Sequence, residues 1–211
     1  MKIQALAPTR ISLFGGGTDV EPYASRFGGI VINMAINVRQ KMVLYEGDDL
    51  FSQESTFPYD ADPHFVWKIL EAFGVNGMHH LAIKSEFDGF IGAGLGSSGA
   101  ASVCLVGGLN KLRNLGLDLN QIAHRAWELE TKYIGIYGGK QDHYIASFGG
   151  VNVMEIGQNV RVTPLMRGFI EPLLPSMSLF YIGERKGKDL QKSFQEPTRE
   201  QIEALHKIKK I

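Results

Sequence analysis

The sequence predicts an α+β fold in which a β-sheet and helices form two layers. Segments with strand character dominate the early part of the chain, and helical segments dominate the later part. The two kinds of segment do not alternate regularly, as they would in a doubly wound α/β protein. No internal repeat is visible along the 211 residues, so we do not expect a repeat architecture.

Strands account for most of the first part of the chain. Residues 3–14 alternate imperfectly between apolar and polar and run into a glycine triplet. Residues 30–46, rich in Ile and Val, predict one or two long strands, and residues 80–87 predict another. Between these strands we expect a short helix over residues 21–27 and a second helix over residues 63–73, whose apolar residues fall on one face.

Helices account for most of the second part. A helix is expected from about Ser97 to Leu112, and the serines in its first turn suit an N-cap. Two further helices are predicted over residues 119–133 and 140–147. Strands are then expected over residues 150–156, 160–163 and 178–182, followed by a charged helix over residues 198–210.

Composition excludes several classes of function. Lys plus Arg equals Asp plus Glu at 22 each, which disfavours a nucleic-acid or membrane-surface binder because these usually carry a basic excess. The single cysteine, Cys104, lies in an apolar run and is expected in the core. No segment resembles a signal peptide or is long enough to cross a membrane. A cytoplasmic protein is therefore expected.

The turn from Gly92 to Ser98 has the composition of an anion site. Glycines allow successive backbone N–H groups to converge, and the following helix adds unsatisfied donors and a partial positive charge. The turn lacks the Gly-Lys-Ser/Thr ending of a Walker A motif and the spacing of a dinucleotide fingerprint. From the residues alone, the alternative is a tight turn that serves only helix packing.

Three motifs resemble signatures of the GHMP kinases, a family that includes galactokinase, homoserine kinase, mevalonate kinase and phosphomevalonate kinase. Gly92–Ala100 resembles the second signature, although Phe90-Ile91 replaces the usual proline. Ala7–Asp19 resembles the first signature, with Gly-Gly-Gly-Thr-Asp where sugar kinases commonly have Gly-Glu-His-Thr-Asp. This glycine form, together with Gly138–Asp142 and the following Phe148-Gly149-Gly150, resembles the branch that acts on D-glycero-D-manno-heptose 7-phosphate.

The resemblance implies a fold and a domain organisation. Residues 1–165 would form the GHMP-kinase N-terminal domain, which has the ribosomal protein S5 domain 2-like fold. Residues 166–211 would begin an α+β C-terminal domain. The third signature of the family is not found before Ile211, so the chain is expected to be the N-terminal domain with the opening of the second.

The resemblance also implies the catalytic and nucleotide-binding residues. Asp142 would be the catalytic acid-base residue, which orients the attacking hydroxyl and accepts its proton. Arg10 would stabilise that carboxylate and the transferring phosphoryl group. The alternative for Asp142 is an aspartate favoured by a helix N-terminus, and for Arg10 a surface residue. ATP would be bound by Gly92, Ala93, Gly94, Leu95, Gly96, Ser97, Ser98 and Gly99.

A magnesium site is implied by the same resemblance. Glu130 precedes Asp142 by the spacing of the family's magnesium-binding glutamate and would hold Mg²⁺ together with Ser98. Glu128 would point elsewhere on the helix. The alternative for Glu130 is an exposed helix glutamate.

Sugar contacts are implied for the glycine triplet and the residues around it. Asp19, with Thr18, would hydrogen-bond sugar hydroxyls, although Asp19 could instead form an Asx turn or a helix cap. The absence of side chains at Gly16 and Gly17 favours a heptose over a hexose, and Gly139 would shape the turn before Asp142. Lys140 and His143 would either meet a substrate phosphate or lie on the surface.

The function that these motifs predict is phosphorylation of a sugar by ATP with Mg²⁺. The acceptor implied by the resemblance is the anomeric hydroxyl of D-glycero-D-manno-heptose 7-phosphate. One alternative is another sugar kinase of the family, of the fucose or galactose type. A second alternative is a truncated domain that binds nucleotide or sugar without turnover. The expected partners are ATP and a sugar phosphate, with neither nucleic acid nor membrane, and a second copy of the chain in a homodimer is left open.

Overall fold

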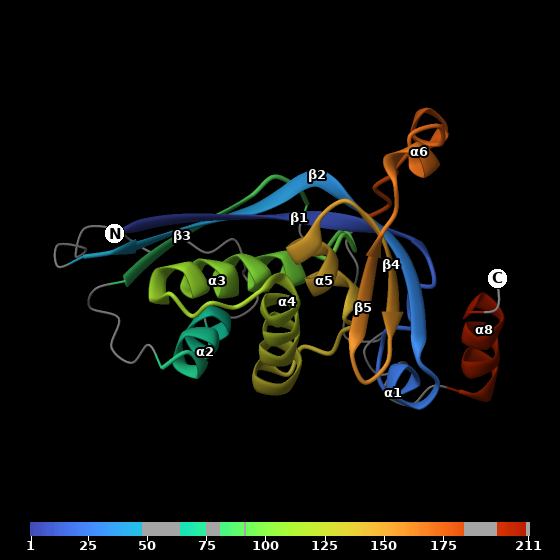
Figure 1. The fold of residues 1–211 in the computed structure, drawn as a ribbon, viewed down its shortest axis with the longest axis horizontal. Helices are drawn as coiled ribbons and strands as arrows, with labels where there is room; N and C mark the ends of the chain where they lie inside the picture. The colour runs from blue at the N-terminus through green and yellow to red at the C-terminus, as the bar shows by residue number, and fades with distance from the viewer. Residues whose placement is uncertain (48–63, 75–80, 91, 184–197, 210–211) are drawn as a thin grey trace.

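The computed structural model describes residues 1–47, 64–74, 81–90, 92–183 and 198–209. One antiparallel sheet of five strands forms one layer, and helices that pack on one of its faces form the other (Figure 1). The expected α+β, two-layer fold is therefore confirmed. The division of the chain at residue 165 stays a prediction.

The sheet is built around one long strand. Strand β2 (Gly29–Glu46) pairs with β1 (Lys2–Phe14) along one edge. Its other edge is shared by two strands, β3 (Leu81–Phe87) beside the second half and β4 (Val151–Ile156) beside the first half. Strand β5 (Val160–Pro164) then pairs with β4.

The pairing of β1 with β2 is irregular where the first signature lies. Pro8 is opposite Arg39 but Arg10 is opposite Ala35, so β2 has extra residues at this point. The hydroxyl of Thr9 donates to the carbonyl of Val38 across the irregularity at 2.8 Å. Bulges of this kind re-aim side chains beside active sites, and this one lies next to Arg10.

The helical layer is centred on α3 (Ser97–Arg113), which crosses under β1 and β2. Leu44 of the sheet and Leu105 and Leu109 of α3 are fully buried in the main core. Burial of one such side chain stabilises the fold by about 1.5–3 kcal/mol. Cys104 also lies in this core, as expected. The other elements of the layer are α1 (Tyr23–Phe27), α2 (His64–Ala72), α4 (Leu119–Glu128) and α5 (Gln141–Phe148).

Two expectations about the helices are wrong in detail. The residue that caps α3 is Gly96, in the left-handed conformation and with no side-chain hydrogen bond, so the serines are not the cap. The helix expected over residues 119–133 ends as an α-helix at Glu128 and continues as a π-helix, η2 (Leu129–Ile134). A π-turn accommodates one more residue per hydrogen-bonded ring than an α-turn, and such turns are frequent at functional sites.

The strand expected over residues 178–182 is also wrong. These residues have no regular structure, and Ile182 is 97% exposed. An apolar run becomes a strand only where a neighbouring strand accepts its backbone hydrogen bonds, and none of the described strands lies beside it. The ring of Tyr181 instead stacks on Phe90, with 5.0 Å between ring centroids.

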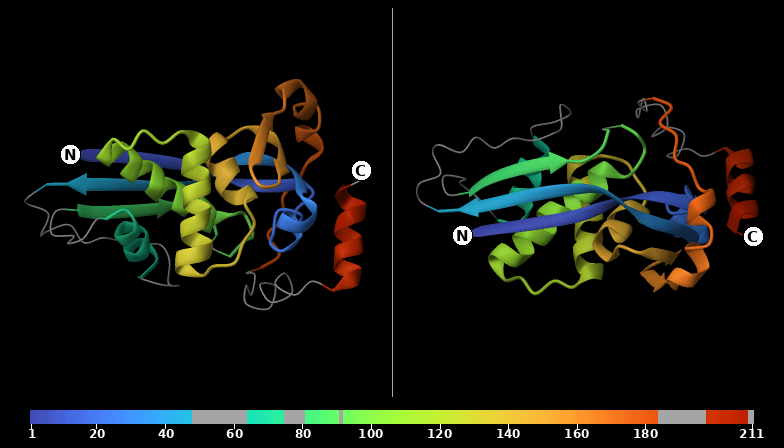
Figure 2. Two further views of the ribbon diagram at one scale, coloured as in Figure 1. Left: turned by 60° about the horizontal axis from the view of Figure 1, so that its bottom comes forward. Right: turned by 90° about the horizontal axis from the view of Figure 1, so that it is seen from above.

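Short elements complete the chain. After β5 come the one-turn helix α6 (Arg167–Ile170) and the 3₁₀ turn η3 (Leu174–Ser176), and the final helix is α8 (Arg199–Lys209). Helix α8 lies beside α1, where the hydroxyl of Tyr23 is 3.0 Å from Nδ1 of His206. Figure 2 shows the start of β1 and helix α8 at opposite ends of the molecule.

Some expected positions cannot be compared. Pro63 and His80 were expected to begin a helix and a strand, and Lys210 was expected to end the last helix. These three residues and Ile91 lie outside the described residues. No described helix is both long enough and apolar enough to cross a membrane.

Candidate functional site

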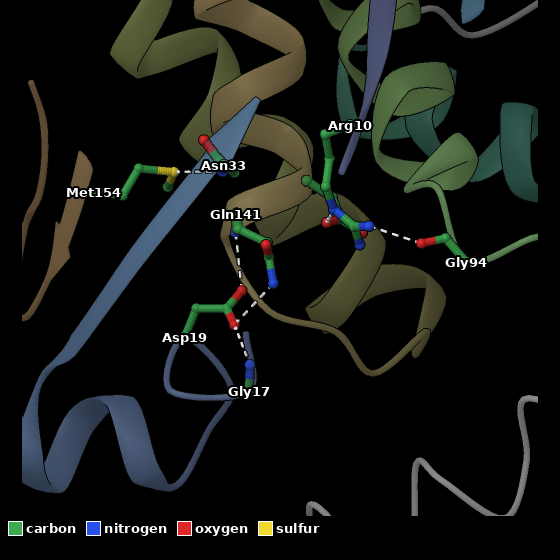
Figure 3. A network of polar contacts seen from close by, with 8 residues as sticks. Arg10, Gly17, Asp19, Asn33, Gly94, Gln141 and Met154 are labelled. Carbon is green, nitrogen blue, oxygen red and sulfur yellow. Dashed lines mark hydrogen bonds and ion pairs between the residues drawn. The ribbon is translucent and has the colours of Figure 1, made fainter. Parts of the chain in front are cut away.

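A cavity of about 510 Å³ opens where the glycine-serine turn, the start of α5 and the loop after β1 meet. These three segments are remote in sequence, and the sheet and α3 bring them together (Figure 3). Most of the expected site residues line the cavity: Arg10, Gly16, Gly17, Asp19, Gly92, Gly94, Gly96, Ser97, Ser98, Glu130, Gly139 and Asp142. Thr18, Ala93, Leu95 and Gly99 do not line it.

The glycine-serine turn depends on its glycines. Gly92, Gly94 and Gly96 all have positive φ, between 75° and 77°, a region in which other residues are strained. The backbone N–H of Arg10 donates to the carbonyl of Leu95 at 3.0 Å and fixes the turn to β1. Because Gly96 caps α3 without a side chain, the first N–H groups of the helix stay available to a ligand. The turn thus has the backbone geometry expected of an anion site at a helix N-terminus.

Arg10 and Asp142 form an ion pair in the wall of the cavity. Nε of Arg10 donates to Oδ1 of Asp142 at 2.6 Å, and its NH1 donates to the carbonyl of Gly94 at 2.7 Å. Burial by itself lowers the pKa of Arg10, but the charge and hydrogen bond of Asp142 outweigh it and raise the pKa above its ordinary value. Arg10 is therefore a permanent cation that joins Asp142 to the glycine-serine turn.

Asp142 lies directly against the start of α3. A Cβ atom placed on Gly99 would lie 2.7 Å from Cβ of Asp142, and one placed on Gly96 would lie 3.0 Å from its Cγ. Both distances are shorter than ordinary van der Waals contact between carbons. These two glycines permit the carboxylate to approach the glycine-serine turn, and this explains the glycine at position 99, which does not line the cavity.

Asp19 is held by the protein itself. Oδ1 accepts from the N–H of Gly17 at 3.1 Å and from Nε2 of Gln141 at 3.2 Å, and Oδ2 accepts from the N–H of Gln141 at 3.0 Å (Figure 3). Asp19 is 1% exposed. Burial raises its pKa, and the negative charge of Asp142 adds to the effect, although the backbone hydrogen bonds oppose it. Oδ2 would lie 1.9 Å from a Cβ placed on Gly139, so only glycine fits there.

Thr18 was expected to contact the sugar, but its side chain lies within the protein interior. Its hydroxyl donates toward the carbonyls of Gly15 and Ile30, at 2.8 and 2.9 Å, and accepts from the N–H of Ile30. The side chain is fully buried. Thr18 therefore fixes the loop to β2 and does not face the cavity.

Glu130 is buried, so the exposed alternative is wrong. It is 4% exposed, and its Oε2 accepts from Oγ of Ser102 at 2.8 Å and lies 2.7 Å from Nε2 of His143. Glu128 is directed elsewhere, as expected, and pairs with Arg125 and Lys132. The two glutamates thus have opposite environments although they are two residues apart.

Ser98 and Glu130 are compatible with a magnesium ion bound to a nucleotide. Ser98 and Ser102 are four residues apart on α3 and so share one face of the helix, and Glu130 bonds to the second of them. Mg²⁺ is usually held by one or two carboxylates together with substrate phosphates and water. The described residues contain no group of three or more His, Cys, Asp or Glu that could hold a metal alone, so the phosphates would supply the remaining ligands.

Four polar residues near the cavity could not be placed from the sequence. Lys140 and His143 are buried and not on the surface, and Nζ of Lys140 lies 4.7 Å from the centre of the Trp127 ring. The family resemblance described above assigned no task to Gln141 or Ser102, yet Gln141 binds Asp19 and Ser102 binds Glu130. The only signal for Ser102 is its polarity within the apolar run of α3 and its spacing from Ser98.

Comparison with known proteins finds a family model that matches part of the chain. Residues 64–150 match the family model described as GHMP kinases N terminal domain. The chain is 29% identical to the D-glycero-alpha-D-manno-heptose 7-phosphate kinase of Campylobacter jejuni, over 98% of this chain and 68% of that protein. The match therefore spans about two thirds of the relative's length.

Solved structures share the fold. The crystal structure of a D-glycero-D-manno-heptose 1-phosphate kinase from Bacteroides thetaiotaomicron superposes with a TM-score of 0.78 at 28% identity, over 100% of this chain and 70% of that one. Galactokinase from Lactococcus lactis, solved with galactose, gives a TM-score of 0.61 at 15% identity, over 97% and 65% of the two chains. At 15% identity, the similarity to this galactokinase is evidence for the fold alone.

Proposed function

We propose that this chain, which carries the N-terminal domain of a GHMP kinase, transfers the γ-phosphoryl group of ATP to a sugar hydroxyl. The observation that carries the proposal is the ion pair of Arg10 and Asp142 beside the glycine-serine turn. A phosphate-binding turn and a carboxylate directed into the same cavity are the two groups that phosphoryl transfer to an alcohol needs.

Each group has a defined task in this reaction. The N–H groups at the start of α3 bind the phosphates of ATP. Asp142 accepts a hydrogen bond from the acceptor hydroxyl and orients its oxygen toward the γ-phosphorus. As the new P–O bond forms, Asp142 takes the hydroxyl proton, the bond between the γ-phosphorus and the β,γ-bridging oxygen breaks, and ADP leaves. Arg10 holds Asp142 in place and offsets negative charge on the transferring group. Mg²⁺, held by Ser98 and Glu130, would neutralise charge on the ATP phosphates.

The acceptor that we propose is the anomeric hydroxyl of D-glycero-D-manno-heptose 7-phosphate. The name of the Campylobacter jejuni relative supports this sugar, whereas the Bacteroides protein is named as a kinase of heptose 1-phosphate. Gly16 and Gly17 line the cavity, and we propose that their backbone faces the sugar. Asp19, which lines the same wall, is proposed as its hydroxyl partner.

A coupled assay of ADP release over a panel of acceptors tests this function. The panel contains heptose 7-phosphate, heptose 1-phosphate, fucose, galactose and mevalonate. We expect turnover with heptose 7-phosphate and little with the others. Turnover of a free hexose without turnover of heptose 7-phosphate would contradict the proposed substrate. Binding of ATP with Mg²⁺ but no turnover of any acceptor would favour a binding domain over an enzyme.

A further inference from the structure

The first turn of α5 supplies one of the three acidic residues that line the cavity and contacts the other two, through three consecutive side chains. Gln141 binds Asp19, Asp142 pairs with Arg10, and the third residue, His143, contacts Glu130. Asp142 is used by the proposed reaction itself, and Gln141 fixes the loop that carries Asp19. His143 has no role in the proposed mechanism, yet it is buried in the wall of the cavity.

The contact between His143 and Glu130 has a defined direction. Nε2 of His143 lies 2.7 Å from Oε2 of Glu130, and an ionised carboxylate can only accept hydrogen bonds. Nε2 must therefore carry the hydrogen. Nδ1 of His143 is buried and has no hydrogen-bond partner among the described residues, so the hydrogen bond of the ring within this part of the chain is the one that Nε2 makes. His143 thus contributes one N–H donor, and this donor goes to Glu130.

Glu130 is fixed at both its backbone and its carboxylate. Its carbonyl accepts from the N–H groups of Gly135 and Ile136 at the end of η2. Both side-chain donors, Ser102 and His143, bind the same oxygen, Oε2. Two donors on one oxygen determine the orientation of the carboxylate and leave Oε1 as the oxygen for a further partner.

We propose that His143 is a positioning residue that holds the carboxylate of Glu130 in the orientation needed to bind a nucleotide-bound Mg²⁺ ion. This inference rests on the proposed function, which assigns Glu130 to that ion. His143 does not itself touch the ion or the nucleotide. Its effect passes through one charge-assisted hydrogen bond, and such bonds are stronger than those between neutral groups.

Two substitutions of similar length separate this role from simple packing. In His143→Gln the side-chain amide can still donate to Glu130, whereas in His143→Met a chain of the same length has no donor. If His143 only fills space, the two variants should behave alike. If it positions Glu130, Gln should retain function and Met should lose it. His124, an exposed histidine on α4, provides the control variant His124→Met.

The test is calorimetric titration of the full chain with ATP, once with Mg²⁺ and once with EDTA. We expect His143→Met to weaken ATP binding in Mg²⁺ by about tenfold, the size of one hydrogen bond to a charged group, and to leave binding in EDTA unchanged. His143→Gln should lie within about threefold of the parent in both buffers, and His124→Met should match the parent. Circular dichroism checks that each variant is folded, and His143→Phe replaces His143→Met if the latter does not fold.

The outcomes distinguish this inference from the proposed function. Equal affinities of the parent, the Met variant and the Gln variant in Mg²⁺ would overturn the role of His143 and leave the kinase proposal intact. An equal loss in EDTA and in Mg²⁺ would also overturn it, because the effect would then not involve the ion. A parent chain that binds no ATP in either buffer would overturn the proposed function, and this inference with it.

Discussion

Nε of Arg10 lies 2.6 Å from Oδ1 of Asp142, although the two residues are 132 positions apart in the sequence. The ion pair joins the bulged part of β1 to the first turn of α5 and closes one side of the cavity around the glycine-serine turn. Because NH1 of Arg10 also binds the carbonyl of Gly94, one guanidinium positions both the carboxylate and the backbone of the glycine-serine turn.

Replacement of Arg10 by Lys should disturb the contacts of Arg10 with Asp142 and Gly94. A lysine ammonium cannot make both hydrogen bonds in the fixed geometry of a guanidinium. We expect Arg10→Lys to lower kcat at least about tenfold, because loss of about 1.4 kcal/mol of transition-state stabilisation has that effect. Steady-state kinetics measures the loss. Arg113→Lys is the control, since Arg113 pairs with Glu46 on the surface and should leave kcat unchanged.

Addition of one methyl group at Gly99 should displace Asp142. The new Cβ would lie 2.7 Å from Cβ of Asp142, and relief of such overpacking costs about 1–3 kcal/mol. Gly107→Ala, in the same helix, meets nothing within 4 Å and should stabilise the protein by about 0.5–1 kcal/mol. Urea unfolding of both variants tests the pair. Equal and small effects would mean that Asp142 is not packed against α3.

The pKa of Asp19 predicts a dependence of stability on pH. Burial and the charge of Asp142 raise this pKa, so the folded state binds the proton more tightly than the unfolded state, where the pKa is about 3.9. The contribution of Asp19 to stability is therefore present below that value and is lost as pH rises through the folded pKa.

The measurement is the free energy of unfolding of the parent minus that of Asp19→Asn, determined in urea from about pH 3.5 upward, just below that unfolded value. This difference should fall as pH rises, by at most about 1.4 kcal/mol per pH unit. A difference that rises with pH would mean that the hydrogen bonds from Gly17 and Gln141 outweigh burial and favour the ionised carboxylate.

Much of the fold could be predicted because the periodic spacing of apolar residues is visible in the sequence. The Ile and Val residues of β2 and the apolar run of α3 indicated these elements to within a few residues. The π-helix η2 could not be predicted, since an α-turn and a π-turn place the same apolar residues on nearly the same face. The strand expected over residues 178–182 did not form, although its residues are apolar. A strand requires a neighbouring strand, and the local sequence does not specify one.

Part of the candidate site could likewise be predicted from the sequence, and part could not. The glycine-serine turn could be predicted from local geometry, because positive φ and a helix start are properties of one short segment. The proximity of Arg10 to Asp142 is a tertiary contact, and it was expected only through the family resemblance. The partners of Gln141 and His143 were not expected at all, since adjacent residues on a helix point in different directions and the sequence does not state which acid each one meets.

The replacement Asp142→Asn tests the central claim most directly. The amide keeps the size of the side chain but cannot take the proton of the acceptor hydroxyl. Phosphorus NMR of the chain with ATP, Mg²⁺ and heptose 7-phosphate follows the transferred group itself. We predict a new sugar-phosphate resonance with the parent and a rate on the order of 10²–10⁴ lower with Asp142→Asn, while both chains bind ATP equally. Equal rates of product formation by the two chains would contradict the assignment of Asp142 and, with it, the site described around Arg10 and the glycine-serine turn.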